Sequence, residues 1–251
     1  MNTTWRLYVI CSVLAFGLGF GTWLLKAQTQ TLRVVPYSTV ERLTVENKHV
    51  ALLRTSVSST GSLATETGDR LVILDVAQKL EIIGDRMTQA YVRAPLSARR
   101  IAGLTAKLSD CVTFFKGTRE RVTVQCEPGG SAFGHPLVKV TITKTLSDGS
   151  SGTEVLHVIE KLGWLIARKE QYDSAGRLGM KMEVIELKEG EPAASDFSVP
   201  FGYREMPNFL ELARVEQSAR GKTLTPEQEK MHMQKWENVT KEARAEGDRR
   251  F

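Results

Sequence analysis

The chain has 251 residues, of which 41% are hydrophobic and 25% are charged, and its formal net charge is +5. These values fit an ordinary globular protein with one main domain and an appendage. The basic residues are spread along the chain without interleaved aromatic residues, which argues against a nucleic-acid partner. The positive charge favours attraction to anionic lipid head groups, and the alternative is a surface with no charged partner.

The N-terminal segment predicts a membrane anchor. An uncharged stretch from Leu7 to Leu25 is flanked by Arg6 and Lys26. As an α-helix it would reach about 28 Å, close to the thickness of the hydrocarbon core of a bilayer. The stretch is longer than the apolar core of a cleaved signal peptide, which has about 7–15 residues. We therefore expect an uncleaved transmembrane helix within residues 1–26, with a cleaved signal as the alternative.

The orientation of this anchor follows only weakly from local charge. Arg6 on one side is nearly balanced by Lys26 and Arg33 on the other. A short tail ahead of the first hydrophobic segment usually stays in the cytoplasm. We therefore expect a linker over residues 27–35, followed by a folded domain outside the cytoplasm.

Residues 36–206 are predicted to form an antiparallel β domain. Short segments rich in Val, Ile, Thr and Leu are separated by turn residues, and no helical spacing lies between most of them. A less regular segment, 98–110, predicts a short helix, and 147–153 predicts a loop. The expected strands are 37–46, 50–58, 70–74, 79–84, 88–93, 137–146, 154–162, 164–172 and 178–187.

Two cysteines bracket a segment with alternating apolar residues. Folding this segment about Thr118 and Arg119 as a hairpin places Cys111 directly opposite Cys126, at a separation that a disulfide spans. A bridge that closes this loop would contribute roughly 3 kcal/mol. Disulfides persist in oxidising compartments, so this prediction depends on export. The alternative is two free thiols in a reducing compartment.

The segment after the last long predicted strand alternates again. Phe197, Val199, Phe201 and Tyr203 alternate with other residues, and Pro200 restricts the backbone. We expect Phe197, Val199, Pro200 and Tyr203 to form a structural strap that lies across the open edge of the sheet or in its core.

The C-terminal segment, residues 207–251, predicts a helical tail. A first helix is expected over 207–219. A second begins at Thr225, where Pro226 at the first helical position and Gln228 at the third complete a capping box. Its apolar stripe is thin, so we expect a solvated or loosely docked helix.

The sequence offers little sign of catalytic chemistry. The four histidines stand alone, and no metal-binding, nucleophile or phosphate-binding motif is present. We therefore expect no catalytic residue, no metal site and no cofactor, and a protein that is not an enzyme.

One motif resembles a known family. Residues 190–203 follow the pattern GEPxxxxFxVPxGY directly after a predicted strand. This ending resembles that of uncharacterised bacterial exported proteins allied to the outer-membrane lipoprotein carrier family (LolA/LolB-like), and the resemblance extends over about residues 35–206. It implies an antiparallel half-barrel whose concave face holds acyl chains. The carrier itself is soluble in the periplasm, whereas this chain carries a predicted anchor.

Two functional hypotheses follow. The first is an envelope protein in the bacterial inner membrane, single-pass and facing the periplasm, which binds a lipid or lipoprotein acyl chain; cleavage of the N-terminal segment would instead release it as an exported protein. The second is a structural or sensory module that binds an envelope protein partner and holds no ligand. A ligand-binding protein should have an apolar concave face, whereas an interaction module should have a filled core and an exposed apolar patch.

Overall fold

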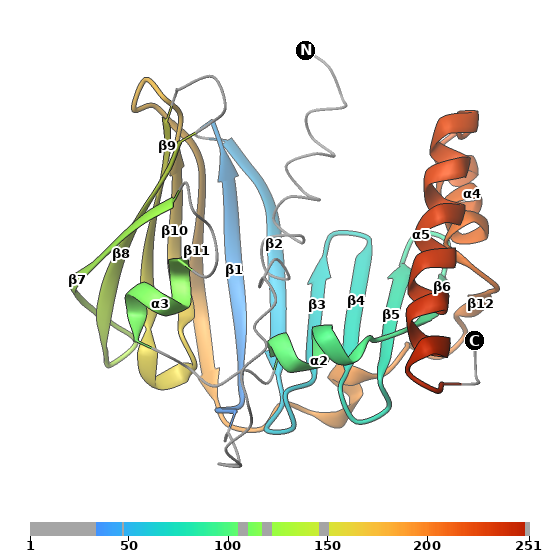
Figure 1. Cartoon of the computed structure of the whole chain (residues 1–251), viewed down its shortest axis with the longest axis horizontal. Coiled ribbons are helices and arrows are strands. Elements are labelled where there is room, and N and C mark those ends of the chain that lie inside the picture. Colours follow the sequence, from blue (N-terminus) through green and yellow to red (C-terminus); the bar gives the residue numbers. More distant parts are fainter. Residues whose placement is uncertain (1–33, 47, 105–109, 117–121, 146–150, 249–251) are drawn as a thin grey trace.

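The computed structural model describes residues 34–46, 48–104, 110–116, 122–145 and 151–248. These residues form one open sheet in the order β12-β6-β5-β4-β3-β2-β1-β11-β10-β9-β8-β7, with a few helices (Figure 1). The strands are β1 Tyr37–Val45, β2 Lys48–Val57, β3 Leu63–Thr67, β4 Arg70–Asp75, β5 Leu80–Asp85, β6 Ala90–Pro95, β7 Val122–Ala132, β8 His135–Thr145, β9 Ser151–Ile159, β10 Leu165–Tyr172, β11 Leu178–Glu189 and β12 Arg204–Met206. The helices are α2 Ala98–Leu104, α3 Cys111–Lys116, α4 Phe209–Ala219 and α5 Pro226–Ala245, with short 3-10 helices η1 Glu160–Leu162 and η2 Ala194–Phe197.

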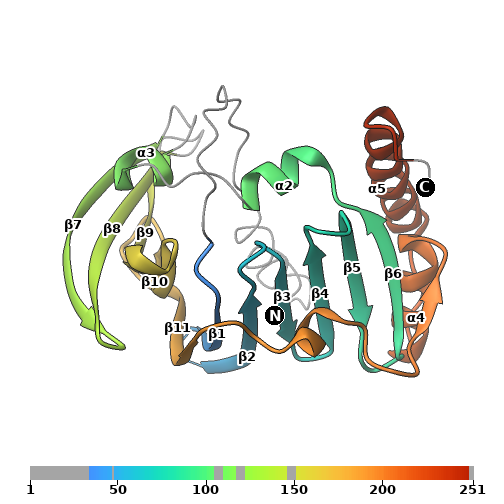
Figure 2. The same ribbon diagram turned by 90° about the horizontal axis from the view of Figure 1, so that it is seen from below.

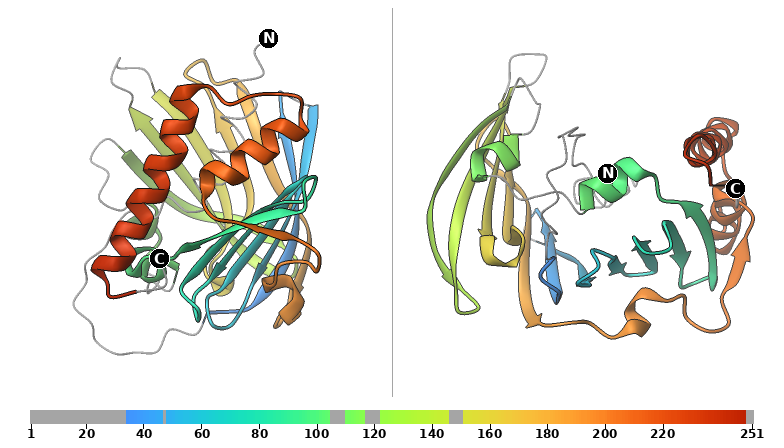
Figure 3. Two further views of the ribbon diagram at one scale, coloured as in Figure 1. Left: turned by 90° about the vertical axis from the view of Figure 1, so that its right-hand side faces the viewer. Right: turned by 60° about the horizontal axis from the view of Figure 1, so that its bottom comes forward.

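The sheet is strongly curved and has two distinct faces (Figure 2). Helices α2, α3 and α4 lie on the concave side, which we call the inner face. The segment of residues 190–203, here called the strap, connects β11 to β12 along the other side, the outer face (Figure 3). The inner face is therefore covered by helices, and the outer face is crossed by the strap.

Strand pairing is antiparallel with one exception. Strand β12 pairs in parallel with β6, and its Arg204 faces Ala90. The strap crosses the outer face from the β11 side of the sheet to β12 without reversing direction, so β12 runs the same way as β11 and β6. The expectation of an antiparallel sheet is therefore confirmed for all the other neighbouring pairs of described strands.

Burial follows the alternation that a two-faced sheet requires. In β1, Leu43 and Glu41 are buried while Arg42 between them is exposed. In β5 every residue is buried, because Ile83 packs against α4 on the inner face and Ile82 against the strap on the outer face. Strands that are covered on both faces therefore show no alternation of buried and exposed residues, whereas strands that are covered on one face do.

The structure confirms the predicted mainly β architecture, with local differences in the strands. Strands β3 and β12 were not expected. Strand β9 begins at Ser151, inside the segment predicted as the loop 147–153. The short helix expected within 98–110 is present as α2. Short strands with few apolar residues carry too weak a pattern to stand out from turns.

Both C-terminal helices begin with a side-chain cap, and α4 begins at Phe209 rather than at the expected residue 207. Asn208 accepts a hydrogen bond from the backbone N–H of Glu211 at 2.9 Å. Thr225 and Gln228 form the expected capping box ahead of α5. Helix α5 is mostly exposed, and it packs on the inner-face cluster through Trp236 and Val239. The ring centroid of Trp236 lies 5.4 Å from that of Phe209 in an edge-to-face arrangement.

The predicted membrane anchor, Leu7 to Leu25, lies outside the described residues. Among the residues that the structure does describe, no helix is long and apolar enough to span a membrane.

Candidate ligand-binding surface on the inner face

The register of the strands defines an apolar surface in the middle of the sheet. Met182 in β11 faces Leu43 in β1, and Leu43 faces Ala51 in β2. Residues two positions along each strand share the same face. The surface, which we call the central inner face, comprises Leu43, Val45, Ala51, Leu53, Met180 and Met182. It is a contiguous apolar cluster drawn from three strands, in which Leu43, Leu53 and Met180 are buried and Val45, Ala51 and Met182 are partly buried.

The central inner face lies between two groups of helices. Helix α3 packs over β7 and β8 at one end of the sheet. Helices α4 and α5 lie over β6 at the other, and α2 is tied to β5 by the ion pair between Arg100 and Glu81. Between α3 and α2, no helix of the described residues lies over β1, β10 and β11 (Figure 2). The middle of the sheet is therefore bounded by helical walls on two sides.

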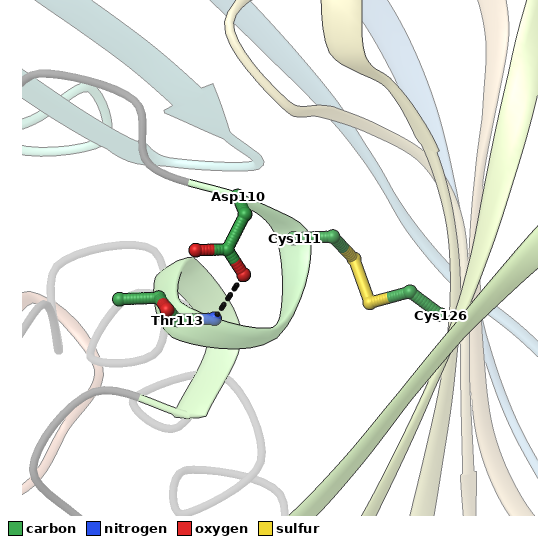
Figure 4. Close-up of a disulfide and its surroundings, with 4 residues drawn as sticks. All are labelled: Asp110, Cys111, Thr113 and Cys126. Carbon is green, nitrogen blue, oxygen red and sulfur yellow. Dashed lines mark hydrogen bonds between the residues drawn. A yellow bond between two sulfur atoms is a disulfide. The ribbon is translucent and has the colours of Figure 1, made fainter.

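A disulfide fixes one of these walls. Cys111 at the start of α3 is bonded to Cys126 in β7, with Cα atoms 6.4 Å apart (Figure 4). Asp110 caps the helix by accepting a hydrogen bond from the backbone N–H of Thr113 at 3.0 Å. The predicted disulfide is confirmed. The predicted hairpin is wrong, because Cys111 belongs to a helix that lies across the sheet.

The wall itself is aromatic. The rings of Phe114 and Phe115 lie 5.6 Å and 5.7 Å from that of Trp164, measured between centroids. Phe115 and Trp164 are both buried with the apolar inner face of β7, β8 and β9. Apolar packing and the disulfide together hold α3 in place.

A buried carboxyl group borders the central inner face on β1. Glu41 is 7% exposed, and the hydroxyl of Thr39 donates a hydrogen bond to it at 2.7 Å. Burial raises the pKa of Glu41 above its ordinary value, although the hydrogen bonds from Thr39 and Thr55 act in the opposite direction. This side chain therefore holds its proton more readily than an exposed glutamate.

A charged cluster borders the surface on the side of β10. The Oε1 atom of Glu154 accepts hydrogen bonds from Lys144 Nζ and Gln171 Nε2, each at 2.8 Å, and lies 3.9 Å from Lys169 Nζ. Burial alone would raise the pKa of Glu154, but the ammonium groups of Lys169 and Lys144 outweigh it and hold that pKa below its ordinary value. Burial lowers the pKa of Lys169, against the opposing charge of Glu154.

The strap residues lie away from this surface. Phe197, Val199 and Tyr203 pack on the outer face against a cluster that includes Leu71 and Ile73. Pro200 begins the next turn, which the hydrogen bond from Tyr203 N–H to the Pro200 carbonyl closes at 3.4 Å. At the tip of this turn Phe201 is fully exposed. The strap therefore covers the outer face and contributes nothing to the inner one.

The outer face also carries an open hollow of about 510 Å³ over β8, β9 and β10. Its lining carries many polar and charged side chains and comprises Lys139, Ser151, Thr153, Val155, His157, Glu170, Tyr172, Asp173, Ser174 and Gly176. This hollow is separate from the central inner face, with which it shares no residue. Within the described part of the chain, no group of three or more His, Cys, Asp or Glu residues could hold a metal ion.

Sequence reasoning did not single out Glu41 and Lys169. A signal for Glu41 was present, because it occupies the same phase of β1 as Thr39 and Leu43, where a buried residue is expected. Lys169 gave no such signal. A bulge between Ile166 and Arg168 shifts the phase of β10, so that Lys169 faces inward beside Met182.

The described fold is that of an open, curved sheet with helices on its concave side. No protein-family model matches the chain, and no curated protein matches it. Among solved structures, the Pseudomonas aeruginosa MucA/MucB complex matches at 18% identity with a TM-score of 0.42, over 68% of this chain and 57% of the other. The chain thus spans little more than half the length of that protein.

Two further solved structures are similar. An uncharacterised conserved protein from Thermus thermophilus matches at 12% identity with a TM-score of 0.44, over 69% of this chain and 90% of the other. A putative outer membrane lipoprotein-sorting protein domain from Vibrio parahaemolyticus matches at 8% identity with a TM-score of 0.23, over 65% and 89%. Similarities this distant carry no argument about the function of this chain.

Proposed function

We propose that this protein is an exported, membrane-anchored binding protein that holds an apolar acyl chain on its central inner face. The observation that carries the proposal is the apolar row Met182, Leu43 and Ala51, which crosses three adjacent strands between two helical walls. Nothing in the proposed activity requires a catalytic residue.

The composition of the surface supports an aliphatic ligand. Two of its six residues, Met180 and Met182, have flexible and polarisable side chains that adapt to ligands of irregular shape. The remaining four are aliphatic. Polar groups lie at the borders of this surface, as in binding sites where a few polar groups orient an otherwise apolar ligand.

The disulfide supports export. Structural disulfides persist in the bacterial periplasm and outside cells, whereas the cytosol keeps thiols reduced. The bond between Cys111 and Cys126 is therefore best explained by a domain that folds outside the cytoplasm. The proposed location is the periplasmic side of the inner membrane, with the anchor at residues 1–26.

Photo-crosslinking of the full chain in its membrane tests the proposal. Cells are fed a fatty acid that carries a diazirine, and the cells are then irradiated. The protein is purified and digested with trypsin, and the labelled peptides are identified by mass spectrometry. We expect labelled peptides from the central inner face, above all residues 182–188 and 43–48. Labelling confined to the predicted anchor, Leu7 to Leu25, would contradict the proposal, because the probe would then report only bilayer lipid.

Two neighbouring residues of β2 provide a matched pair of variants. Ala51 belongs to the central inner face, whereas the side chain of Leu52 points to the outer face and is 48% exposed. Ala51→Trp should fill the surface and remove most of the labelling of residues 182–188. Leu52→Trp adds the same ring on the opposite face and should leave labelling unchanged. Equal labelling of the two variants would overturn the assignment of the site.

The alternative is a protein-interaction module of the envelope, which the full exposure of Phe201 supports. A large aromatic side chain presented to solvent on a tight turn suits the centre of a protein contact. If this alternative holds, Phe201→Ser should abolish capture of a specific envelope protein, while acyl labelling at β11 should be absent.

A further inference from the structure

The hollow on the outer face has the size of a small-molecule site. Its volume of about 510 Å³ lies within the range of about 300–1,000 Å³ that is typical of ligand pockets. His157 of β9 lies opposite Lys139 of β8, and two residues along β9, on the same face, Val155 lies opposite Glu170 of β10. The floor of the hollow is therefore formed by the outer-face side chains of three adjacent strands.

The turn between β10 and β11 forms one wall of the hollow, to which Ser174 and Gly176 contribute. The Oδ1 atom of Asp173 accepts hydrogen bonds from the backbone N–H groups of Ala175 and Arg177, each at 2.9 Å. Its Oδ2 atom accepts a further bond from Arg177 Nε at 2.8 Å. Hydrogen bonds within the turn thus hold this wall in place.

The charged groups of the floor are paired within the protein. Glu170 accepts hydrogen bonds from Arg168 Nε and from the hydroxyl of Tyr172, each at 3.0 Å. The Nζ atom of Lys139 lies 2.7 Å from Glu127 Oε1. Like the carboxylate of Asp173, these groups already have partners of opposite charge. A charged ligand would therefore have to compete with existing ion pairs, which favours a neutral ligand.

Hydroxyl and imidazole groups supply the remaining polar lining. Among the described residues, the side chains of Ser151, Thr153, His157 and Ser174 have no hydrogen-bond partner. A hydroxyl group both donates and accepts, and an imidazole ring offers two nitrogen atoms. Val155 adds an apolar side chain to the same floor. Such a lining complements a molecule that has hydroxyl groups around its edge and C–H groups on its faces, which is the chemistry of a sugar ring.

We propose that the hollow on the outer face binds a neutral oligosaccharide. Its hydroxyl groups form hydrogen bonds with Thr153, His157 and Ser174, and the C–H face of one sugar ring packs on Val155. This site lies on the face of the sheet opposite to the central inner face and does not depend on the proposed binding of an acyl chain.

Isothermal titration calorimetry of the full chain in phosphatidylcholine nanodiscs tests the proposal. The probes are chitotriose and cellotriose, two neutral trisaccharides, and inorganic phosphate as an anion. We expect at least one trisaccharide to bind with a Kd of about 1 mM or tighter and phosphate not to bind. Binding of phosphate alone would overturn the assignment of a neutral ligand. Binding of none of the three probes would overturn the site, and neither outcome would affect the acyl-chain proposal.

A pair of threonine variants locates the binding. Thr153→Val removes one hydroxyl of the lining and keeps the shape of the side chain, so the affinity for the trisaccharide should fall about fivefold, the effect of one hydrogen bond. Thr143→Val is the matched control, because Thr143 lies opposite Thr153 in β8 but does not line the hollow. Equal affinities of the two variants would contradict the proposal.

A third variant blocks the hollow itself. Val155→Trp places a large ring on its floor and should abolish binding of the trisaccharide, while an unchanged urea midpoint verifies that the variant folds. Binding that survives in Val155→Trp would place the saccharide elsewhere on the protein and overturn the site. If Val155→Trp does not fold, the comparison of the two threonine variants decides.

Discussion

Cys111 and Cys126 join the first turn of helix α3 to the middle of strand β7, with Cα atoms 6.4 Å apart. The bond thereby attaches a helix of six residues to the inner face of the sheet. A helix this short has little stability of its own, so its position depends on the disulfide and on the contact of Phe115 with Trp164.

Removing the disulfide should release this wall of the inner face. The double variant Cys111→Ser, Cys126→Ser should lower the free energy of unfolding by about 3 kcal/mol, because the bond closes a loop of about 15 residues. Urea unfolding followed by tryptophan fluorescence measures the change. Cys11→Ser lies outside the described residues and serves as the control that should not change the midpoint. A double variant as stable as the parent protein would contradict the prediction.

The strap offers two phenylalanines with opposite expectations. Phe197→Ala removes a half-buried ring that packs on Leu71 and Ile73, and it should cost about 2 kcal/mol, below the range of a fully buried ring. Phe201→Ala removes a fully exposed ring and should change stability by less than about 0.5 kcal/mol. Thermal unfolding of the two variants measures both. Equal losses would mean that the strap is held by something other than its contact with the outer face.

Helix α5 should contribute little to the stability of the sheet. Of its 20 residues, only Thr240 and Ala243 are buried. Deleting residues 224–251 should therefore lower the melting temperature by only about 2–4 °C, the effect of about 1 kcal/mol in a domain of this size. Trp236→Ala, which removes the ring that contacts Phe209, should reproduce most of that decrease. A loss above about 10 °C would show that α5 supports the sheet directly.

Glu41 and Glu154 should give the protein opposite responses to pH. Burial raises the pKa of Glu41, so its contribution to stability is fully present below the pKa of the unfolded chain and is lost as the pH rises through the folded-state pKa. Relative to Glu41→Gln, the parent protein should therefore lose stability between about pH 4 and neutrality.

Burial works against a low pKa at Glu154, but the ammonium groups of Lys169 and Lys144 hold it below its ordinary value. Its contribution is present above the pKa of the unfolded chain and is lost as the pH falls through the folded-state pKa. Relative to Glu154→Gln, the parent protein should lose stability on acidification below about pH 4. Urea titrations of both variants from pH 3 to 7 give the two slopes, and slopes of the same sign would refute the assignment.

The strands were predictable because their pattern is local. Alternation of apolar and polar residues marks β1 and β8, and the capping box marks the start of α5. The disulfide was also predicted, although for a wrong reason. Proximity of Cys111 to Cys126 comes from a helix that crosses the sheet, and no local pattern distinguishes that arrangement from a hairpin.

The candidate site was not predictable in the same way. It depends on the pairing of β1 with β11, in which Leu43 faces Met182 across about 140 residues of sequence. It depends also on the bulge in β10 that turns Lys169 inward. A bulge changes which face a side chain occupies without leaving a pattern in the residues themselves.

The pairing of β1 with β11 has a consequence for the order of folding. Strands β1 to β6 can pair as a meander as soon as they are made, but one edge of β1 has no partner until residues 178–189 follow. Contacts between distant parts of a chain form late and slow the folding of a sheet. A chain cut short before β11 would thus leave β1 as an open edge, which is prone to pair with another molecule. Strand β11 lies between β1 and β10, and it therefore joins the two halves of the sheet.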